Sequence, residues 1–152
     1  MTSARPRSTA VAGAPELAAD LSFLLARANA LSLAAGNAAL APFGLKARSY
    51  SVLALASGDA RPAQRDLAEY LRLDPSQVVA LVDDLQAKGL VTREPDPTDR
   101  RANVVVATPE GARLFRDAER AARDAERTLH ADLSDAERAE LGRLLARLAF
   151  PG

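Results

Sequence analysis

The sequence contains no cysteine and only one histidine, His130. Without thiols the chain forms no disulfide, no thiolate metal site and no cysteine-based redox sensor. A single histidine is too few for a zinc site built from protein side chains. We therefore expect neither a metal nor a cofactor, and the lack of disulfides fits a cytoplasmic protein.

Aromatic residues and net charge are also scarce. Aromatic side chains make up 4% of the 152 residues, the formal net charge is zero, and the hydrophobic share of 48% comes largely from alanine and leucine. Alanine and leucine favour helices, so the composition predicts a mainly α-helical protein with a hydrophobic core. Any binding to nucleic acid must depend on where arginines are placed, because bulk charge supplies no attraction.

No segment has the pattern of a membrane span. The longest apolar stretch, residues 28–43, is interrupted by polar residues and a proline. It is too short and too rich in alanine to cross a bilayer, so we expect no membrane partner. Residues 1–14 lack an apolar block of the length that a secretion signal needs, and we expect a disordered tail there.

The two ends of the chain predict helices for self-association. Along the first helix, apolar residues recur at alternating steps of four and three, which indicates a face that packs against another helix. These residues are Leu17, Leu21, Leu24, Ala28, Leu31, Ala35 and Ala38. We assign residues 15–45, ended by Pro42 and Gly44, to an N-terminal dimerisation helix, and residues 109–152 to C-terminal dimerisation helices.

Between the ends, two short helices over about 47–57 and 63–71 and a turn at 72–74 precede the best-defined helix of the chain. That helix has an N-cap aspartate, a proline at the first helical position, a glutamine at the capping-box position and a glycine after its end. These residues are Asp74, Pro75, Gln77 and Gly89. A short helix, a turn and a capped helix together predict a helix-turn-helix.

β-branched runs at 90–94 and 103–107 flank a charged turn and predict a hairpin. A cap followed by a proline at Thr108 then opens a long helix to about Asp132, and Ser134 opens the last one. The predicted fold is mainly α with a small β-hairpin. It is a winged helix-turn-helix over residues 46–108, flanked by the dimerisation helices.

Four residues near the start of the capped helix are candidates for contacts with bases. The amide of Gln77 matches the adenine edge, Val79 and Ala80 can pack on thymine methyl groups, and Ser76 can bond to phosphate or base. The alternative is that this is a capped helix with no role in DNA binding.

The tip of the hairpin carries Asp99, Arg100 and Arg101. Guanidinium groups are attracted to a narrow minor groove, and we predict that Asp99 holds one arginine in an ion pair while the other inserts. Alone, this tripeptide is typical of a solvated turn, but its place after a helix-turn-helix is more specific. Flanking arginines are candidates for phosphate contacts, with a plain surface role as the alternative for each. They are Arg48, Arg61, Arg65, Arg72 and Arg93.

At these residues the sequence resembles the MarR family of regulators. The resemblance covers residues 47–114 and is carried by 73–76, 81–85, 88–91, Arg93 and 96–101, with Val105, Thr108 and Gly111 after them. It implies an obligate homodimer, a pseudo-palindromic operator with half-sites about one DNA turn apart, and release by a small anionic or phenolic ligand.

The chain departs from the family pattern at a few positions of the recognition helix. Gln77, Val79 and Ala80 stand where threonine and arginine are common, so base preference is not transferable. Asp84 replaces a common basic residue, and we predict that Lys88, one turn later, neutralises it. Further along the chain, alternating arginines and acids from Arg113 to Arg127 predict an exposed, ion-paired face.

The candidate ligand-binding residues are Arg27, Asn37 and Tyr50. Arg27 stands out because it lies among apolar residues, where an unpaired charge is costly. A structural ion pair or an exposed arginine is the alternative for Arg27. An enzyme is disfavoured, because His130 has no serine nucleophile near it in sequence and Asp83 and Asp84 point about 100° apart on a helix. The sequence thus predicts a DNA-binding regulator, with repression the favoured action. A winged-helix module for protein contact remains the alternative.

Overall fold

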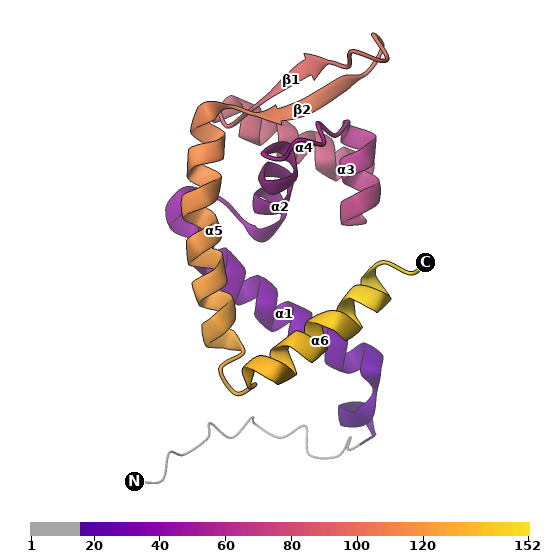
Figure 1. The fold of residues 1–152 in the computed structure, drawn as a ribbon, viewed down its shortest axis with the longest axis vertical. Helices are drawn as coiled ribbons and strands as arrows, with labels where there is room; N and C mark the ends of the chain where they lie inside the picture. Colours follow the sequence, from indigo (N-terminus) through magenta and orange to yellow (C-terminus); the bar gives the residue numbers. More distant parts are fainter. Residues whose placement is uncertain (1–15) are drawn as a thin grey trace.

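The computed structural model describes residues 16–152, so the tail predicted at residues 1–14 lies outside the described residues. The elements are α1 (Leu21–Leu40), α2 (Ala47–Ala56), α3 (Gln64–Leu71), α4 (Pro75–Ala87), β1 (Val91–Pro95), β2 (Asn103–Ala107), α5 (Pro109–Leu129) and α6 (Asp135–Ala149). Figure 1 shows the reading domain, formed by α2, α3, α4 and the hairpin, at one end and the crossing helices α1 and α6 at the other, with α5 running between them. The predicted mainly helical fold with one hairpin is confirmed.

The first helix begins four residues later than the leucine spacing predicts. Leu17–Ala19 forms a separate 3-10 turn, and the carboxylate of Asp20 caps α1 by accepting a hydrogen bond from the Phe23 backbone N–H at 2.9 Å. At the other end Ala41–Phe43 makes another 3-10 turn, closed by Gly44 at φ 68°. A glycine fits this left-handed conformation because it has no Cβ to clash.

The predicted caps of α4 are confirmed. Asp74 accepts a hydrogen bond from the Ser76 backbone N–H at 2.9 Å, and the side-chain oxygen of Gln77 accepts one from the Asp74 N–H at 3.2 Å. The chain leaves the helix through Gly89 at φ 72°. These bonds satisfy N–H groups that a helix start leaves without partners, and so they fix where α4 begins.

The hairpin is a two-stranded antiparallel sheet in which Val91 pairs with Ala107 and Pro95 with Asn103. It is joined to the helices by a hydrogen bond of 2.8 Å from the Val105 N–H to the carbonyl of Pro62, in the link between α2 and α3. The wing is therefore attached to the helix-turn-helix by backbone as well as by side chains.

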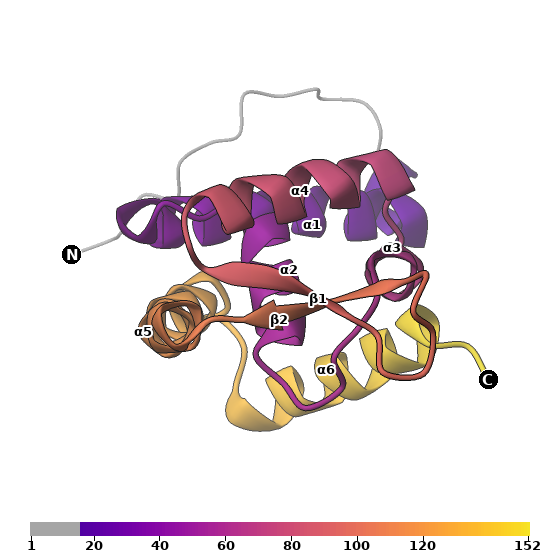
Figure 2. The same cartoon turned by 90° about the horizontal axis from the view of Figure 1, so that it is seen from above.

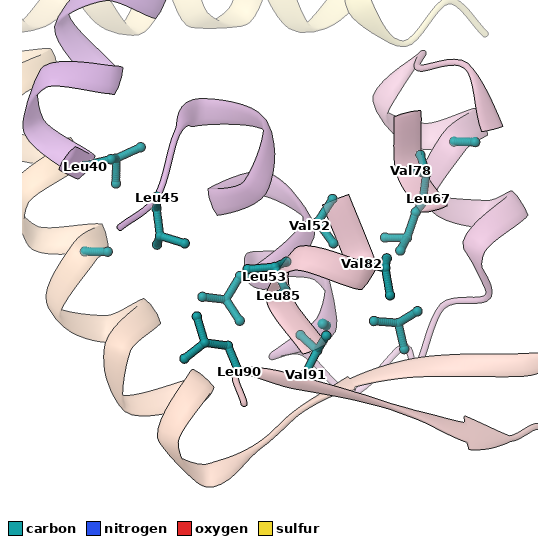
Figure 3. Close-up of a cluster of buried hydrophobic side chains, with 14 residues drawn as sticks. Leu40, Leu45, Val52, Leu53, Leu67, Val78, Val82, Leu85, Leu90 and Val91 are labelled. Atoms are coloured by element: carbon teal, nitrogen blue, oxygen red, sulfur yellow. The ribbon is translucent and has the colours of Figure 1, made fainter. Parts of the chain in front are cut away.

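The core lies inside the reading domain (Figure 3). Most of its leucines and valines come from α2, α3, α4 and both strands, Leu40 at the end of α1 completes it, and no aromatic side chain among residues 16–152 is buried. Its largest fully buried members are Leu40, Leu53, Leu67, Leu85, Val52, Val78, Val82, Val91 and Val105. Each such side chain contributes about 1.5–3 kcal/mol when removed from water, so this domain supplies most of the burial in one protomer.

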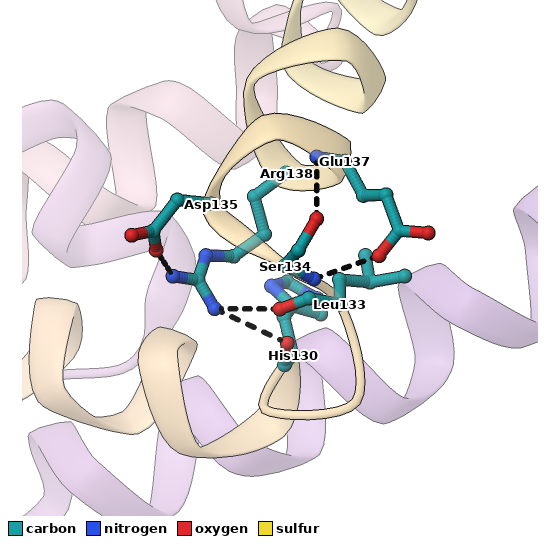
Figure 4. A network of polar contacts seen from close by, with 6 residues as sticks. All are labelled: His130, Leu133, Ser134, Asp135, Glu137 and Arg138. Atoms are coloured by element: carbon teal, nitrogen blue, oxygen red, sulfur yellow. Dashed lines mark hydrogen bonds and ion pairs between the residues drawn. The ribbon is translucent and has the colours of Figure 1, made fainter.

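The turn between α5 and α6 is held by polar contacts (Figure 4). The backbone N–H of Ser134 donates to Glu137 at 2.7 Å, and the Glu137 N–H donates to the Ser134 hydroxyl at 3.2 Å. Arg138 donates to the carbonyls of His130 and Leu133 and pairs with Asp135. The sharp reversal into α6 is thus specified by the capping box that the sequence predicts.

In contrast, α1 and α6 expose most of their leucines. Leu21 is 76% exposed and Leu148 is 68% exposed, and a groove of about 890 Å³ between α1, α5 and α6 is lined mainly by leucines. The segment Leu21–Phe43 is long and apolar enough, with a mean hydropathy of 1.2, to cross a membrane by length and composition alone, and only 6% of its most apolar 18-residue window is buried. Residues 28–43 are thus part of a longer apolar segment, but length and composition do not by themselves indicate a membrane span.

We predict that Gly111→Ala destabilises the reading domain. A Cβ at Gly111 would lie 1.9 Å from the backbone carbonyl oxygen of Leu90, so α5 and the strand start must move apart. We expect a loss of about 2–3 kcal/mol in the free energy of unfolding, measured in urea. Gly142→Ala is the matched control, because its Cβ meets nothing within 4 Å, and it should stabilise by about 0.5–1 kcal/mol. Equal stability of the two variants would contradict the close approach.

Candidate nucleic-acid interface

The recognition helix and the hairpin lie side by side at one end of the molecule. Seen from above, α4 runs along one side of β1 and β2, and α3 lies near the tip of the hairpin (Figure 2). The buried stripe of α4 turns Ser76, Gln77, Val79 and Ala80 outward, and all four are exposed. The four residues predicted to contact bases therefore share one exposed surface.

The two polar candidates on α4 are already engaged by the helix cap. The hydroxyl of Ser76 donates to the Asp74 carboxylate at 2.6 Å, and the Gln77 side-chain oxygen accepts from the Asp74 backbone. The hydrogen bonds from the Ser76 hydroxyl and backbone N–H lower the pKa of the Asp74 carboxyl, so Asp74 stays ionised. A bidentate contact of Gln77 to adenine needs its oxygen and its NH₂ group, and thus requires the capping bond to open.

The apolar candidates are free. Val79 is 40% exposed, and it lines a hollow of about 460 Å³ between α3 and α4. The apolar lining comes from Ala68, Leu73, Pro75 and Val79, and Gln64, Arg65 and Glu69 complete it. The sequence alone does not indicate this hollow, because it depends on the angle between the two helices.

The wing tip is organised by its aspartates. Asp96 accepts hydrogen bonds of 2.8 Å from the backbone N–H and the hydroxyl of Thr98, which lower the pKa of the Asp96 carboxyl. The Asp99 carboxylate accepts the backbone N–H of Arg101 at 3.0 Å. The prediction that Asp99 holds an arginine side chain is wrong: within residues 16–152, neither Arg100 nor Arg101 has an ion-pair partner, and both are exposed.

Arg93 has a different role from the phosphate contact that the sequence suggests. Its guanidinium donates to Gln64 at 2.8 Å, to Gln86 at 2.6 Å and to Asp83 at 2.6 Å. The side chain is 23% exposed. Each of its three nitrogen atoms donates to a partner on α3 or α4, so Arg93 ties the wing to both helices of the helix-turn-helix.

The other predicted phosphate contacts divide into two groups. Arg61, in the left-handed region at φ 46°, pairs with Glu94 of β1 at 2.5 Å and is half exposed. Arg48, Arg65 and Arg72 are exposed, and of these only Arg65 has an acidic neighbour, Asp66 at 3.7 Å, among the described residues. Arg48 and Arg72 therefore have no ion-pair partner among the described residues, and Arg65 has only an exposed one.

The sequence also predicts ion pairs at the end of α4 and along α5. Lys88 pairs with Asp84 at 2.8 Å, as predicted, and also donates to the Gly44 carbonyl at 3.0 Å. On α5, Arg123 pairs with Glu119 at 2.7 Å, and two further arginines pair with aspartates one turn before them. The ion-paired exposed face predicted for this helix is confirmed for Arg120, Arg123 and Arg127, whereas Arg113 and Arg116 are exposed without an ion-pair partner among the described residues.

The three residues guessed for a ligand site do not converge. The Asn37 side-chain oxygen accepts the Ala47 N–H at 2.8 Å and thereby caps α2. Arg27 lies exposed on α1, the helix that also carries Asn37. At 1.5 Å per residue the two residues are about 15 Å apart along the helix axis. Tyr50 packs its ring 5.6 Å from that of Phe115 on α5, and burial, then the charge of Glu119, raises the pKa of its hydroxyl.

Comparison with known proteins identifies the family. Residues 43–102 match the sequence pattern of the MarR family. The chain is 42% identical to a transcriptional regulator (MarR family) from Rhodococcus sp. RHA1, whose structure matches with a TM-score of 0.85 over 90% of this chain and 96% of that one. CouR from Rhodococcus jostii RHA1, solved with p-coumaroyl-CoA bound, is 40% identical with a TM-score of 0.78, over 89% and 95% of the two chains.

Two further relatives extend the comparison. A MarR variant from E. coli, solved with operator DNA, is 27% identical with a TM-score of 0.76, over 84% of this chain and 92% of that one. A protein of Thauera aromatica described as a transcriptional regulatory protein for the hcr operon is 36% identical over 99 residues, 65% of this chain and 60% of that protein. The chain therefore belongs to the MarR family of winged helix-turn-helix proteins, a family of transcriptional regulators rather than enzymes.

We predict that Arg93→Lys destabilises the reading domain although it keeps the charge. A lysine carries its three N–H groups on one nitrogen, so it cannot reach the acceptors on Gln64, Gln86 and Asp83 that Arg93 meets with three different nitrogen atoms. We expect a loss of about 1–3 kcal/mol in unfolding free energy. Arg48→Lys, at an exposed position without an ion-pair partner among residues 16–152, is the control. If both variants unfold alike, the contacts of Arg93 do not stabilise the domain.

Proposed function

We propose that the protein is a homodimeric, cytoplasmic transcriptional repressor that binds a pseudo-palindromic operator. The observation that carries this proposal is the convergence of α4 and the unpaired arginines of the wing on one surface. On a duplex, α4 would enter the major groove while Arg100 and Arg101 reach the adjacent minor groove. The E. coli relative solved with operator DNA supports binding of an operator by this fold.

Self-association is supported by the unpartnered leucines of α1 and α6. Exposed apolar surface of this extent is unusual on a monomer, and a second copy laid along the groove would bury it. The same contact accounts for the apolar character of α1 without a membrane. Two copies related by a twofold axis would then place their α4 helices in successive major grooves, which is the geometry that a pseudo-palindrome requires.

The first test measures operator binding by fluorescence anisotropy at several salt concentrations, using a duplex selected from random DNA. Arg100→Ala and Arg101→Ala should each weaken binding to all sequences and lower the slope of log affinity against log salt by about one. The matched control is Arg120→Ala on α5, which removes the same charge from an ion pair far from the wing. If the affinity for the preferred duplex is unchanged by both wing substitutions, the proposed docking is wrong.

The second test concerns the dimer. Leu148→Glu should give monomers in sedimentation experiments and abolish operator binding, because it places a charge on the apolar face of α6. Ala139→Glu puts the same charge on the opposite face of that helix and should leave the dimer intact. If Leu148→Glu remains dimeric, α6 does not form the interface.

We further propose that an aromatic acid or its coenzyme A thioester releases the protein from DNA. CouR is solved with p-coumaroyl-CoA, which is both anionic and phenolic. Because Arg27, Asn37 and Tyr50 do not converge on one point, we propose that they contact different parts of a ligand as long as a coenzyme A thioester. Arg27 carries the argument, because it has no ion-pair partner among residues 16–152 and is free to meet an anion.

The ligand proposal is tested by adding p-coumaroyl-CoA to the protein–operator complex. Release is expected, and Arg27→Ala should raise the concentration needed about tenfold while leaving operator affinity unchanged. Adding coenzyme A and p-coumarate individually shows which half of the ligand causes release. Release that is the same in Arg27→Ala would remove Arg27 from the site.

A further inference from the structure

The outward face of α4 has little charge to offer DNA. Asp83 is held by Arg93 and Asp84 by Lys88, and within α4 itself there is no basic residue. Its polar groups near the start are tied to Asp74. Apart from the NH₂ groups of Gln77 and Gln86, what the helix presents without an internal partner is apolar, and Val79 is its only exposed large hydrophobic side chain.

The apolar surface continues from Val79 into the hollow between α3 and α4. Arg65 stands at this hollow with its side chain 83% exposed, and Glu69 lies one helical turn further along α3. A nucleotide placed at the Arg65 end would set its phosphate against a cation and its base edge against Val79. Of the groups on the major-groove edge of DNA, only the thymine 5-methyl is apolar.

We propose that Val79 is the main specificity-determining residue of α4 and that it selects a thymine by burying the 5-methyl group beside the hollow. This inference rests on the proposed function, since it needs α4 in the major groove. It ranks Val79 above Gln77, because reading adenine by Gln77 would first break the capping bond to Asp74. Base preference would thus come from apolar contact rather than from hydrogen bonds.

The test removes single methyl groups from DNA. Starting from a selected operator, each thymine is replaced in turn by deoxyuridine, which changes nothing but the methyl group. One position per half-site should lose about fourfold in affinity, the effect of one buried methyl group. At that position 5-methylcytosine should bind better than cytosine by a similar factor, since the two bases again differ by the methyl group alone.

Protein variants then assign the effect to one side chain. Val79→Ala should bind thymine and deoxyuridine operators equally, whereas Gln77→Ala should keep the fourfold difference. Val79→Ile retains an apolar β-branched side chain and should also keep it. Because Val79 is 40% exposed, these variants should fold normally, which their thermal unfolding checks.

The failures are distinguishable. The role of Val79 is overturned if no deoxyuridine substitution in the selected operator lowers the affinity, or if the methyl effect persists in Val79→Ala. Either result leaves the proposed function standing. A protein that selects no duplex at low salt overturns the proposed function itself.

Discussion

The orientation of α4 depends on the burial of one apolar stripe, and the rest of the interface depends on that orientation. Val78, Val82 and Leu85 are each 0% exposed. They pack against α2, α3 and the strands, and rotating the helix would return all three to water. At about 1.5–3 kcal/mol for each side chain, this burial outweighs any single polar contact on the helix. The opposite face is therefore held outward in the free protein.

The wing and the long helix are fixed relative to this stripe by close contacts. Arg93 joins β1 to α3 and α4, and Gly111 lets the first turn of α5 approach the backbone of Leu90. α5 then runs to the terminal helices, where Phe150 after α6 packs its ring 5.5 Å from that of Tyr70 on α3. The reading domain is thus joined to the terminal helices on two sides. A rearrangement of α1 and α6 would act on it through α5 and through this aromatic contact.

Local signals made most of the fold predictable from the sequence. The caps at Asp74, Thr108 and Ser134 act within three residues, so their geometry can be inferred without knowing the fold. Apolar spacing places the start of α1 at Leu17, because the spacing continues through a 3-10 turn that only the Asp20 cap reveals. Periodicity thus predicts that a helix is present, whereas a hydrogen bond determines where it begins.

The candidate site was less predictable, because its partners are distant in sequence. Arg93 contacts residues seven, ten and 29 positions away, and no pattern in the chain distinguishes it from an exposed arginine. The Asp99 prediction failed for a different reason. An aspartate in a turn often binds a backbone N–H two residues on, and here this local bond to Arg101 wins over an exposed ion pair.

The pairing of charges also explains how a chain of zero net charge can present a surface for DNA. Three acids near the expected groove are each held by a cation: Asp83 by Arg93, Asp84 by Lys88, and Glu94 by Arg61. Pairing reduces the repulsion that these carboxylates would exert on phosphates, at the expense of cations that do not then face DNA. The attraction is left to exposed arginines outside α4, including Arg72 and the wing pair. In the proposed docking, affinity and base preference would be separated: arginines around the helix would supply the first, and an almost uncharged helix face the second.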